Sequence, residues 1–380
     1  MSPVAAAAQG SFGLSHACDG PPDAADWDAL FASGVAPHPH VSRHVIAAHR
    51  SAGLLPKDLR FVTIRDGAKL VAVLPYTMTR DITGLGGRVA RPFLSPFMTA
   101  SAPLIADGPH RAARAQALVD GLASASGGRA WRWPLLPTED GAGPVMLAAM
   151  RARGWAIGTV SAFDRPVMER RADHDTFLAG HPNRARFKDL RRRARRLSEA
   201  GTVAHESAAC GADLDRLVAA FLDLERAGWK GQTGTAMACR PETVALAHTL
   251  FSAGSGPVGV RADALTLDGR PIAISLALLG AGTATLLKTA YDETLRSHAP
   301  GLLLEAEIVR ACHETGFADQ LDSATLEGSA LESLYRDRTR IAEIIAVPPG
   351  SHALSLERRL RIARFEAQAR STAKRALGRR

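Results

Sequence analysis

Runs of apolar, β-branched residues separated by turn residues organise the first half of the chain. The stretch FVTIRDGAKLVAVLPYTMTR (61–80) has two such runs on either side of Asp66-Gly67, a pattern typical of a β-hairpin. The surrounding pattern predicts strands at 93–105, 130–136 and 155–169, and helices at 26–52, 110–125 and 144–153. Residues 1–25 are rich in Ala, Gly and Ser, and we expect them to be disordered.

The second half of the chain repeats this plan. A second hairpin is predicted at Asp268-Gly269, 202 residues after the first. The pattern predicts helices at 173–200, 211–227, 241–253, 301–316 and 329–337, and strands at 202–208, 257–267, 270–279, 282–290, 319–324 and 341–347. Asp-Gly hairpins are common, so one shared hairpin does not establish a duplication. Helices before it and an αβ unit after it also recur, which favours two copies of one domain with a mixed sheet.

Composition and charge indicate the size of the protein and where its positive charge lies. At 380 residues and 46% hydrophobic content, the chain can form two globular domains. Its net charge of +9 is concentrated in two places, RARFKDLRRRARR (184–196) and the segment 356–380, so the rest of the chain is net acidic. Phe187, Leu190, Ala194 and Leu197 make one apolar stripe along the first basic run, which predicts an amphipathic helix. Its arginines either form a basic wall for an anionic ligand or a solvated face.

The basic end of the chain, 348–380, is expected to form a helical tail after Pro348-Pro349-Gly350. It is interpreted either as a solvated, fraying helix or as a contact with anionic lipid. The sequence shows no signal peptide and no apolar stretch long enough to span a bilayer. We therefore expect a cytoplasmic protein that can be peripheral at the inner face of the membrane.

Four cysteines without CxxC spacing do not indicate a metal site. His38, His40 and His44 lie close together in sequence, but no cysteine or carboxylate stands at ligand spacing, so we interpret them as surface histidines and expect no metal.

The segment LLKTAYDETLRSHAPGLLLEAEIVRA (286–311) is the most informative for chemistry. A strand ends at Tyr291, a polar loop follows, and Pro300-Gly301 opens an apolar helix. The positive end of that helix, with Arg296 in the loop, suits a phosphate or pyrophosphate. An ordinary strand–loop–helix connection is the alternative interpretation.

Three segments together resemble a known family. RFKDLRRRARRLSEAG, FLDLERAGWKGQTGTA and LKTAYDETLRSHAPGLLLEAEIV, in this order and spacing across about 184–347, are similar to GNAT-like acyltransferases of the CelD/BcsL type, relatives of the FemAB peptidyltransferases. The resemblance implies an α+β fold of two tandem GNAT-like domains, each a mostly antiparallel mixed sheet flanked by helices. We place these domains at 26–170 and 171–347. The Gly-rich pyrophosphate loop of ordinary GNAT proteins is replaced here by RSHAPGL, which keeps only Gly301.

The resemblance also implies an activity, the transfer of an acyl (acetyl) group from acyl-CoA to an amine or hydroxyl acceptor. The expected setting is exopolysaccharide or cell-envelope glycan biosynthesis, with a small-molecule or glycan acceptor. Candidate bases are Asp292 and Asp322, and candidate acids are Tyr291 and Tyr335. The candidate donor-binding residues are Lys288, Thr289, Arg296, Ser297, His298, Gly301 and Leu302. The candidate acceptor-binding residues are Trp229, Lys230 and Arg192. Each of these residues also has an ordinary structural interpretation.

Two alternatives stay open. The first is FemAB-like transfer from aminoacyl-tRNA, with the basic run on tRNA phosphates. The second is a non-enzymatic protein that binds nucleic acid or another anionic surface. Only 5% of the residues are aromatic, which leaves few side chains for base stacking, and we expect no stable nucleic-acid partner.

Overall fold

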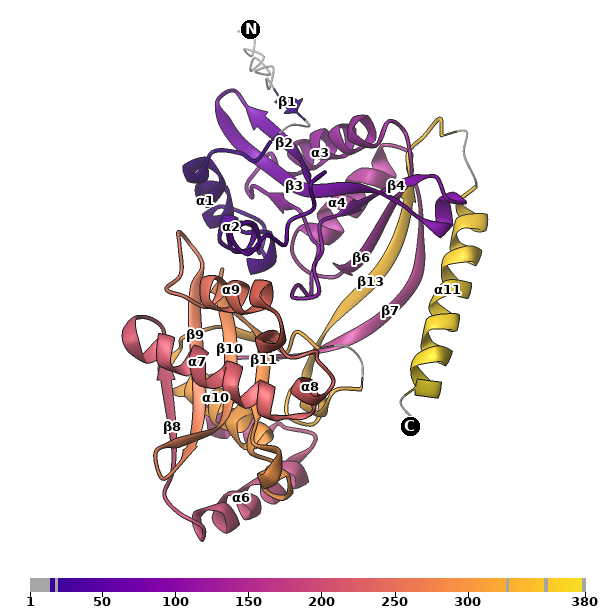
Figure 1. Cartoon of the computed structure of the whole chain (residues 1–380). Coiled ribbons are helices and arrows are strands. Elements are labelled where there is room, and N and C mark those ends of the chain that lie inside the picture. Colours follow the sequence, from indigo (N-terminus) through magenta and orange to yellow (C-terminus); the bar gives the residue numbers. More distant parts are fainter. Residues whose placement is uncertain (1–13, 18–19, 326–327, 352–354, 378–380) are drawn as a thin grey trace, which may run out of the picture.

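The computed structural model describes residues 14–17, 20–325, 328–351 and 355–377, and all its strands belong to one sheet (Figure 1). The strand order is β1-β2-β3-β4-β6-β13-β7-β12-β11-β10-β9-β8, with β5 beside β3. The strands are β1 (Leu14–Ala17), β2 (Arg60–Asp66), β3 (Lys69–Arg80), β4 (Arg88–Pro92), β5 (Leu104–Ile105), β6 (Trp131–Pro137), β7 (Ala156–Glu169), β8 (Val203–Ala208), β9 (Gly259–Leu267), β10 (Arg270–Gly280), β11 (Thr283–Tyr291), β12 (Gln320–Asp322) and β13 (Asp337–Val347).

Helices flank this sheet. The α-helices are α1 (Ala24–Ala32), α2 (Arg43–Ser51), α3 (Arg111–Ser126), α4 (Ala142–Ala152), α5 (His174–Ala179), α6 (Arg184–Ser198), α7 (Gly211–Ala227), α8 (Trp229–Gln232), α9 (Pro241–Leu250), α10 (Pro300–Thr315) and α11 (Leu356–Leu377). Short 3-10 helices are η1 (Pro39–Val41), η2 (Ile82–Gly84), η3 (Met237–Cys239), η4 (Glu293–His298) and η5 (Ala330–Ser333). The fold is α+β, as the sequence predicts.

The two halves of the chain repeat one arrangement. Both predicted hairpins form, β2–β3 and β9–β10. In each half an antiparallel meander ends at a short parallel pair, β4 with β6 and β11 with β12. A helix lies between the two strands of each parallel pair in sequence, α3 in the first half and α10 in the second. The structure therefore confirms two tandem domains of one type.

The last strand of the chain joins the two halves. β13 lies between β6 and β7 and pairs antiparallel with both, while β7 also pairs with β12. A strand from the end of the chain thus completes the sheet of the first half, and a strand from the first half borders the sheet of the second (Figure 1). The predicted boundaries at 170 and 347 fall at the ends of β7 and β13, and where each domain ends stays a prediction.

Proline positions explain three differences from the predicted elements. The single helix expected at 26–52 is divided into α1 and α2 around Pro37 and Pro39, and the one expected at 173–200 is divided into α5 and α6 around Pro182. Of the strand expected at 93–105, only Leu104–Ile105 forms, because Pro96 and Pro103 cannot donate to a ladder.

The N-terminal segment also differs from the prediction. Leu14–Ala17 form β1, which pairs with β2, and α1 begins at Ala24, so these parts of the expected disordered tail are ordered. The remainder of that prediction, residues 1–13 and 18–19, lies outside the described residues.

The three clustered histidines are not surface residues, contrary to the prediction. His40 and His44 are buried and His38 is half-buried. The His40 Nδ1 atom accepts the Thr99 amide at 2.9 Å, and burial holds the pKa of His40 well below its usual value. The His44 Nε2 atom lies 2.9 Å from the Leu250 carbonyl oxygen, so this side chain links the two halves.

The tail forms a helix as predicted, but α11 packs on the sheet instead of extending into solvent. Ala363 and Arg359 are buried, and the Arg359 guanidinium donates to the Thr83 carbonyl oxygen at 2.7 Å. Figure 1 shows α11 lying along the outer side of β7 and β13. Within the described part of the chain, no helix has the length and apolar composition to cross a bilayer.

The buried Arg132 guanidinium holds α11, β13 and the loop after β3 together. Its Nε atom is 2.6 Å from Glu343 Oε1 on β13, and its Nη1 atom is 2.8 Å from Glu366 Oε2 on α11 and 3.2 Å from Asp81 Oδ2. Burial raises the pKa of Asp81, but hydrogen bonds from Thr83 and the charges of Arg91 and Arg132 outweigh it and leave that pKa below its usual value.

We predict that Arg132→Ala lowers the free energy of unfolding by about 3–5 kcal/mol, because it removes one of the two cations beside the buried Asp81 and leaves Glu343 without the partner that Arg132 provides. Urea denaturation at pH 7 measures this. The control is Arg153→Ala, which removes the exposed pair with Asp120 and should cost less than about 1 kcal/mol. An equal effect of the two substitutions would contradict the role given to Arg132.

Candidate active site

A pocket opens where two parallel strands diverge. β11 and β12 pair only from Thr283 to Thr285 and from Gln320 to Asp322. Beyond this point β11 continues to Tyr291 while the other chain turns away, and the gap between them is not closed by strand pairing. A pocket of about 400 Å³ lies there, lined by β11, Arg296, Ala299, the start of α10, and residues 323–325 and 329–331.

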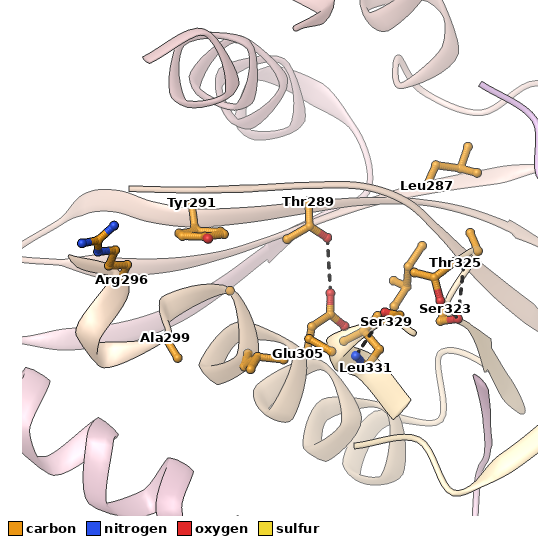
Figure 2. A pocket seen from close by; sticks show the side chains of 15 residues that line it. Leu287, Thr289, Tyr291, Arg296, Ala299, Glu305, Ser323, Thr325, Ser329 and Leu331 are labelled. Atoms are coloured by element: carbon orange, nitrogen blue, oxygen red, sulfur yellow. Dashed lines mark hydrogen bonds between the residues drawn. The ribbon is translucent and has the colours of Figure 1, made fainter. Parts of the chain in front are cut away.

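The pocket is elongated and its two ends differ in chemistry. Figure 2 shows Arg296, Ala299 and Tyr291 at one end, Glu305 near the middle, and Ser323 and Thr325 toward the other end. The Ser323 and Thr325 hydroxyl oxygens lie 2.8 Å apart. An extended ligand with an anionic end and a polar reacting end fits such a pocket.

The connection between η4 and α10 forms the end of the pocket that suits an anionic group. Ala299 has a left-handed backbone (φ 54°), and α10 begins at Pro300 without a capping side chain. Pro300 has no amide proton and the Leu302 amide donates to the Ala299 carbonyl at 3.0 Å. Among the described residues, the Gly301 amide is therefore the first-turn donor without a backbone partner.

Gly301 also fits the site sterically. A Cβ atom at this position would lie 3.2 Å from Cδ1 of Tyr291, closer than side chains normally pack. The absence of a side chain lets the Tyr291 ring lie against the start of α10. This is a structural reason for glycine at the one position that the sequence shares with the GNAT pyrophosphate loop.

Glu305 is the functional candidate that sequence analysis missed. Its side chain points from α10 into the pocket and is only 2% exposed. Oε1 lies 3.4 Å from the hydroxyl oxygens of Ser275 and Thr289, and Oε2 accepts the Tyr335 hydroxyl at 3.3 Å. One signal was available, since Glu305 falls in the apolar run LLLEAEIV on the stripe that α10 buries.

The environment of Glu305 raises its pKa from 4.5 to about 7. Burial is the main cause and the charge of Asp263 adds to it, while the hydrogen bonds from Tyr335, Ser275 and Thr289 act in the opposite direction. A carboxyl group with a pKa near neutrality exchanges protons readily at pH 7. Tyr335 is fully buried and its pKa is raised well above 10.0, so it stays protonated and donates to Glu305.

The pocket brings together some of the predicted donor-binding residues. Thr289, Arg296, Gly301 and Leu302 line it, as does Tyr291, which is 39% exposed. Ser297 and His298 lie at the end of η4 and are not among its lining residues. Lys288 is half-buried on β11 with its Nζ 5.0 Å from the Phe97 ring centre, and burial lowers its pKa.

The two predicted bases lie outside the pocket. Asp292 caps η4, accepting the Thr294 amide at 3.0 Å, and pairs with Arg270 at 3.0 Å. Asp322 is buried between the halves, 3.4 Å from Arg165 and 3.6 Å from His38, in a separate pocket of about 100 Å³. Burial raises the pKa of Asp322, but the charge of Arg165 and the contact with His38 outweigh burial and lower it.

The predicted acceptor-binding residues occupy two places. Trp229 and Lys230 begin α8, beside a shallow hollow of about 40 Å³ that Thr289 and Tyr291 also line. Lys230 Nζ is 2.9 Å from Glu225 Oε1, and the Trp229 ring is exposed. Arg192 lies on α6 and pairs with Asp189 at 2.6 Å, away from both pockets.

One protein-family model matches part of the second half of the chain. Residues 184–325 match the model of the acetyltransferase (GNAT) domain family, a range that runs from α6 to just past β12. No match was found among curated proteins.

Among solved structures, FemX aligns with a TM-score of 0.56 at 8% identity, over 87% of this chain and 96% of FemX. The C-terminal domain (DUF2156) of a putative lysylphosphatidylglycerol synthetase from Agrobacterium fabrum aligns with a TM-score of 0.48 at 12% identity, over 80% of this chain and 87% of that one. A tandem GNAT protein from the clavulanic acid biosynthesis pathway aligns with a TM-score of 0.45 at 15% identity, over 89% and 99%.

Residues 184–325 therefore resemble the acetyltransferase (GNAT) domain family, and the chain, with its two repeated halves, shares the fold of FemX. The more specific resemblance to the CelD/BcsL type stays a prediction.

We predict that the Glu305 carboxyl makes the protein less stable as the pH rises. The unfolded pKa is near 4.5 and the folded pKa about 7, so the contribution of the neutral acid is complete below pH 4.5 and lost as the pH rises through 7. The loss amounts to at most about 3 kcal/mol. Urea denaturation at pH 5, 7 and 9 should show a smaller decline for Glu305→Gln than for the native chain. Parallel declines would show that the carboxyl is not buried as described.

Proposed function

We propose that this protein is an acyltransferase that moves an acyl group, acetyl in the simplest case, from acyl-CoA to an amine or hydroxyl acceptor. The observation that carries the proposal is the pocket between the diverging strands β11 and β12, with the start of α10 and Arg296 at one end. An open strand edge beside a helix N-terminus can bind an extended amide-containing arm and a phosphate group together.

The residues at the mouth fit the phosphates of such a donor. The Arg296 guanidinium, the Gly301 amide and the positive end of α10 all lie at the same end of the pocket. The donor supplies an activated thioester. In the loop RSHAPGL, Pro300 has no amide proton and the amides of Ala299 and Leu302 are paired within the loop, so Arg296 carries a larger share of anion binding.

We assign proton removal to Glu305. As the acceptor nitrogen or oxygen forms its bond to the acyl carbon and the carbon–sulfur bond breaks, the acceptor proton passes to this carboxylate. Its pKa of about 7 leaves a large fraction ionised at neutral pH. Tyr335 positions the carboxyl through its hydrogen bond. Tyr291 lines the same pocket and is the candidate that returns a proton to the departing thiolate.

The acceptor is proposed to approach over α8, where the exposed Trp229 ring and Lys230 lie beside Tyr291. Exposed aromatic rings commonly stack on sugar rings, so a glycan or amino-sugar acceptor suits this surface. Exopolysaccharide or cell-envelope glycan biosynthesis remains the setting that the sequence resemblance implies.

The donor is tested by thermal shift with millimolar CoA and acetyl-CoA, since a ligand stabilises the folded state by RT ln(1 + [L]/Kd). We predict that Arg296→Ala weakens CoA binding roughly 10–100-fold, the effect of losing one charged hydrogen-bond donor. Arg216→Ala, an exposed arginine paired with Glu206, is the matched control and should leave binding unchanged. No shift for the native chain with any acyl-CoA would refute the donor assignment.

The base is tested by the pH dependence of acyl transfer once an acceptor is found. We predict that kcat/KM rises with pH through an apparent pKa near 7 and that Glu305→Gln lowers it about 10²–10⁴-fold. Asp292→Asn, which removes a cap outside the pocket, should keep the same pH profile. If Asp292→Asn abolishes the dependence of kcat/KM on pH and Glu305→Gln does not, the base is Asp292.

A second candidate function is transfer from aminoacyl-tRNA. The observation in its favour is that the basic helix α6 packs on η4, with the Arg193 guanidinium donating to the Ser297 carbonyl of the loop that leads to Ala299 and Gly301. Salt-sensitive binding of aminoacyl-tRNA, without any effect of acyl-CoA on thermal stability, would favour this function.

A further inference from the structure

The turn between β3 and β4 exposes large apolar side chains. Ile82 is 50% exposed and Leu85 is 69% exposed. Leu85 has a left-handed backbone (φ 52°), a conformation in which Gly and Asn are favoured over leucine. Packing within the protein does not account for either side chain, so their apolar character points to something outside the chain.

The backbone of this turn is already paired. Between Asp81 and Gly87, the amides of residues 81, 84, 85, 86 and 87 all donate to carbonyl oxygens of the same turn, and the Thr83 amide donates to Asp81 Oδ1 at 2.8 Å. A segment that enters an apolar medium must satisfy its polar backbone internally. This turn satisfies six of the seven amides from residue 81 to residue 87 before any partner binds.

Cations surround the apolar tip. Arg80 and Arg88 are opposite each other in the β3–β4 register, and both are exposed. The only acid of the turn, Asp81, is buried and paired with Arg91 and Arg132. Arg358 and Arg361 are exposed on the neighbouring helix α11. None of these four exposed arginines has an ion-pair partner within the part of the chain that the structure describes.

The tip is also held in place. The buried Arg359 guanidinium of α11 donates to the Thr83 carbonyl oxygen at 2.7 Å. η2 lies beside the N-terminal end of α11 at the edge of the molecule (Figure 1). A fixed tip loses little conformational entropy on docking.

We propose that this tip, residues 80–88, docks on an anionic lipid bilayer, with Ile82 and Leu85 entering the interfacial region and Arg80 and Arg88 contacting lipid phosphates. Two side chains at a hairpin tip offer far less area than the roughly 800 Å² per partner of a stable protein interface. Partition of a few apolar groups with help from nearby cations is instead sufficient for reversible membrane contact. The sequence placed membrane contact in the basic tail, and this proposal moves it to the hairpin tip, independently of the donor.

The test is co-sedimentation of the full chain with phosphatidylcholine vesicles and with vesicles containing about 30% phosphatidylglycerol. The native chain should bind the anionic vesicles and bind neutral ones weakly. Ile82→Ser with Leu85→Asn should reduce binding about tenfold or more, and Asn suits the left-handed position, so the fold is kept. Arg80→Gln with Arg88→Gln should reduce binding by about fivefold per arginine, on anionic vesicles only.

The matched control is Arg50→Gln with Arg60→Gln, two exposed arginines without ion-pair partners in the described residues, which removes the same charge elsewhere and should bind like the native chain. Thermal denaturation of every variant confirms folding. The proposal is overturned if the native chain does not bind anionic vesicles, if the control loses as much binding as the Arg80/Arg88 variant, or if sedimentation velocity shows a dimer that the Ile82/Leu85 variant abolishes.

Discussion

The insertion of β13 between β6 and β7 is the constraint on which the rest of this structure depends. Its pairing runs from Asp337 to Val347 and joins the end of the chain to the sheet of the first half. The residues just before this strand are therefore fixed in space. Tyr335 is one of them, and its hydroxyl reaches Glu305 in the second half. The strand that pairs with the first half thus fixes a residue that supports a side chain at the centre of the pocket.

The pocket follows from a local failure of strand pairing. Since β11 and β12 are hydrogen-bonded over only three residues, the chain beyond them leaves a gap that α10 covers from one side. The buried face of α10 would ordinarily be apolar, yet it places Glu305 against Ser275 and Thr289. Burying a carboxyl group is unfavourable unless it is protonated or hydrogen-bonded. The pKa near 7 reflects that balance, and it also gives the site a group able to accept a proton at neutral pH.

Several arginines of the basic helix α6 are paired within the protein, although the composition of the helix predicts a solvated or ligand-binding face. Asp189 accepts hydrogen bonds from Arg186, Arg192 and Arg193, and Phe187 and Leu190 bury the apolar stripe. Arg193 further contacts the η4 loop through the Ser297 carbonyl. Part of the positive charge is therefore paired within α6 and with the η4 loop. The remaining exposed arginines of α6 do not line the donor pocket.

The sequence by itself determined the local elements, both Asp-Gly hairpins, the apolar stripe of α6 and the strand–loop–helix with Arg296 and Gly301, because turn residues and apolar periodicity are local properties. It also indicated the repeat and the fold class. It could not find Glu305 as a site residue, the burial of Asp322 against Arg165, or the docking of α11 on the sheet. The contacts of Glu305 span 16 to 30 positions, and those of Asp322 and α11 span more than 100. Only the tertiary structure decides which charges lose water and what faces them.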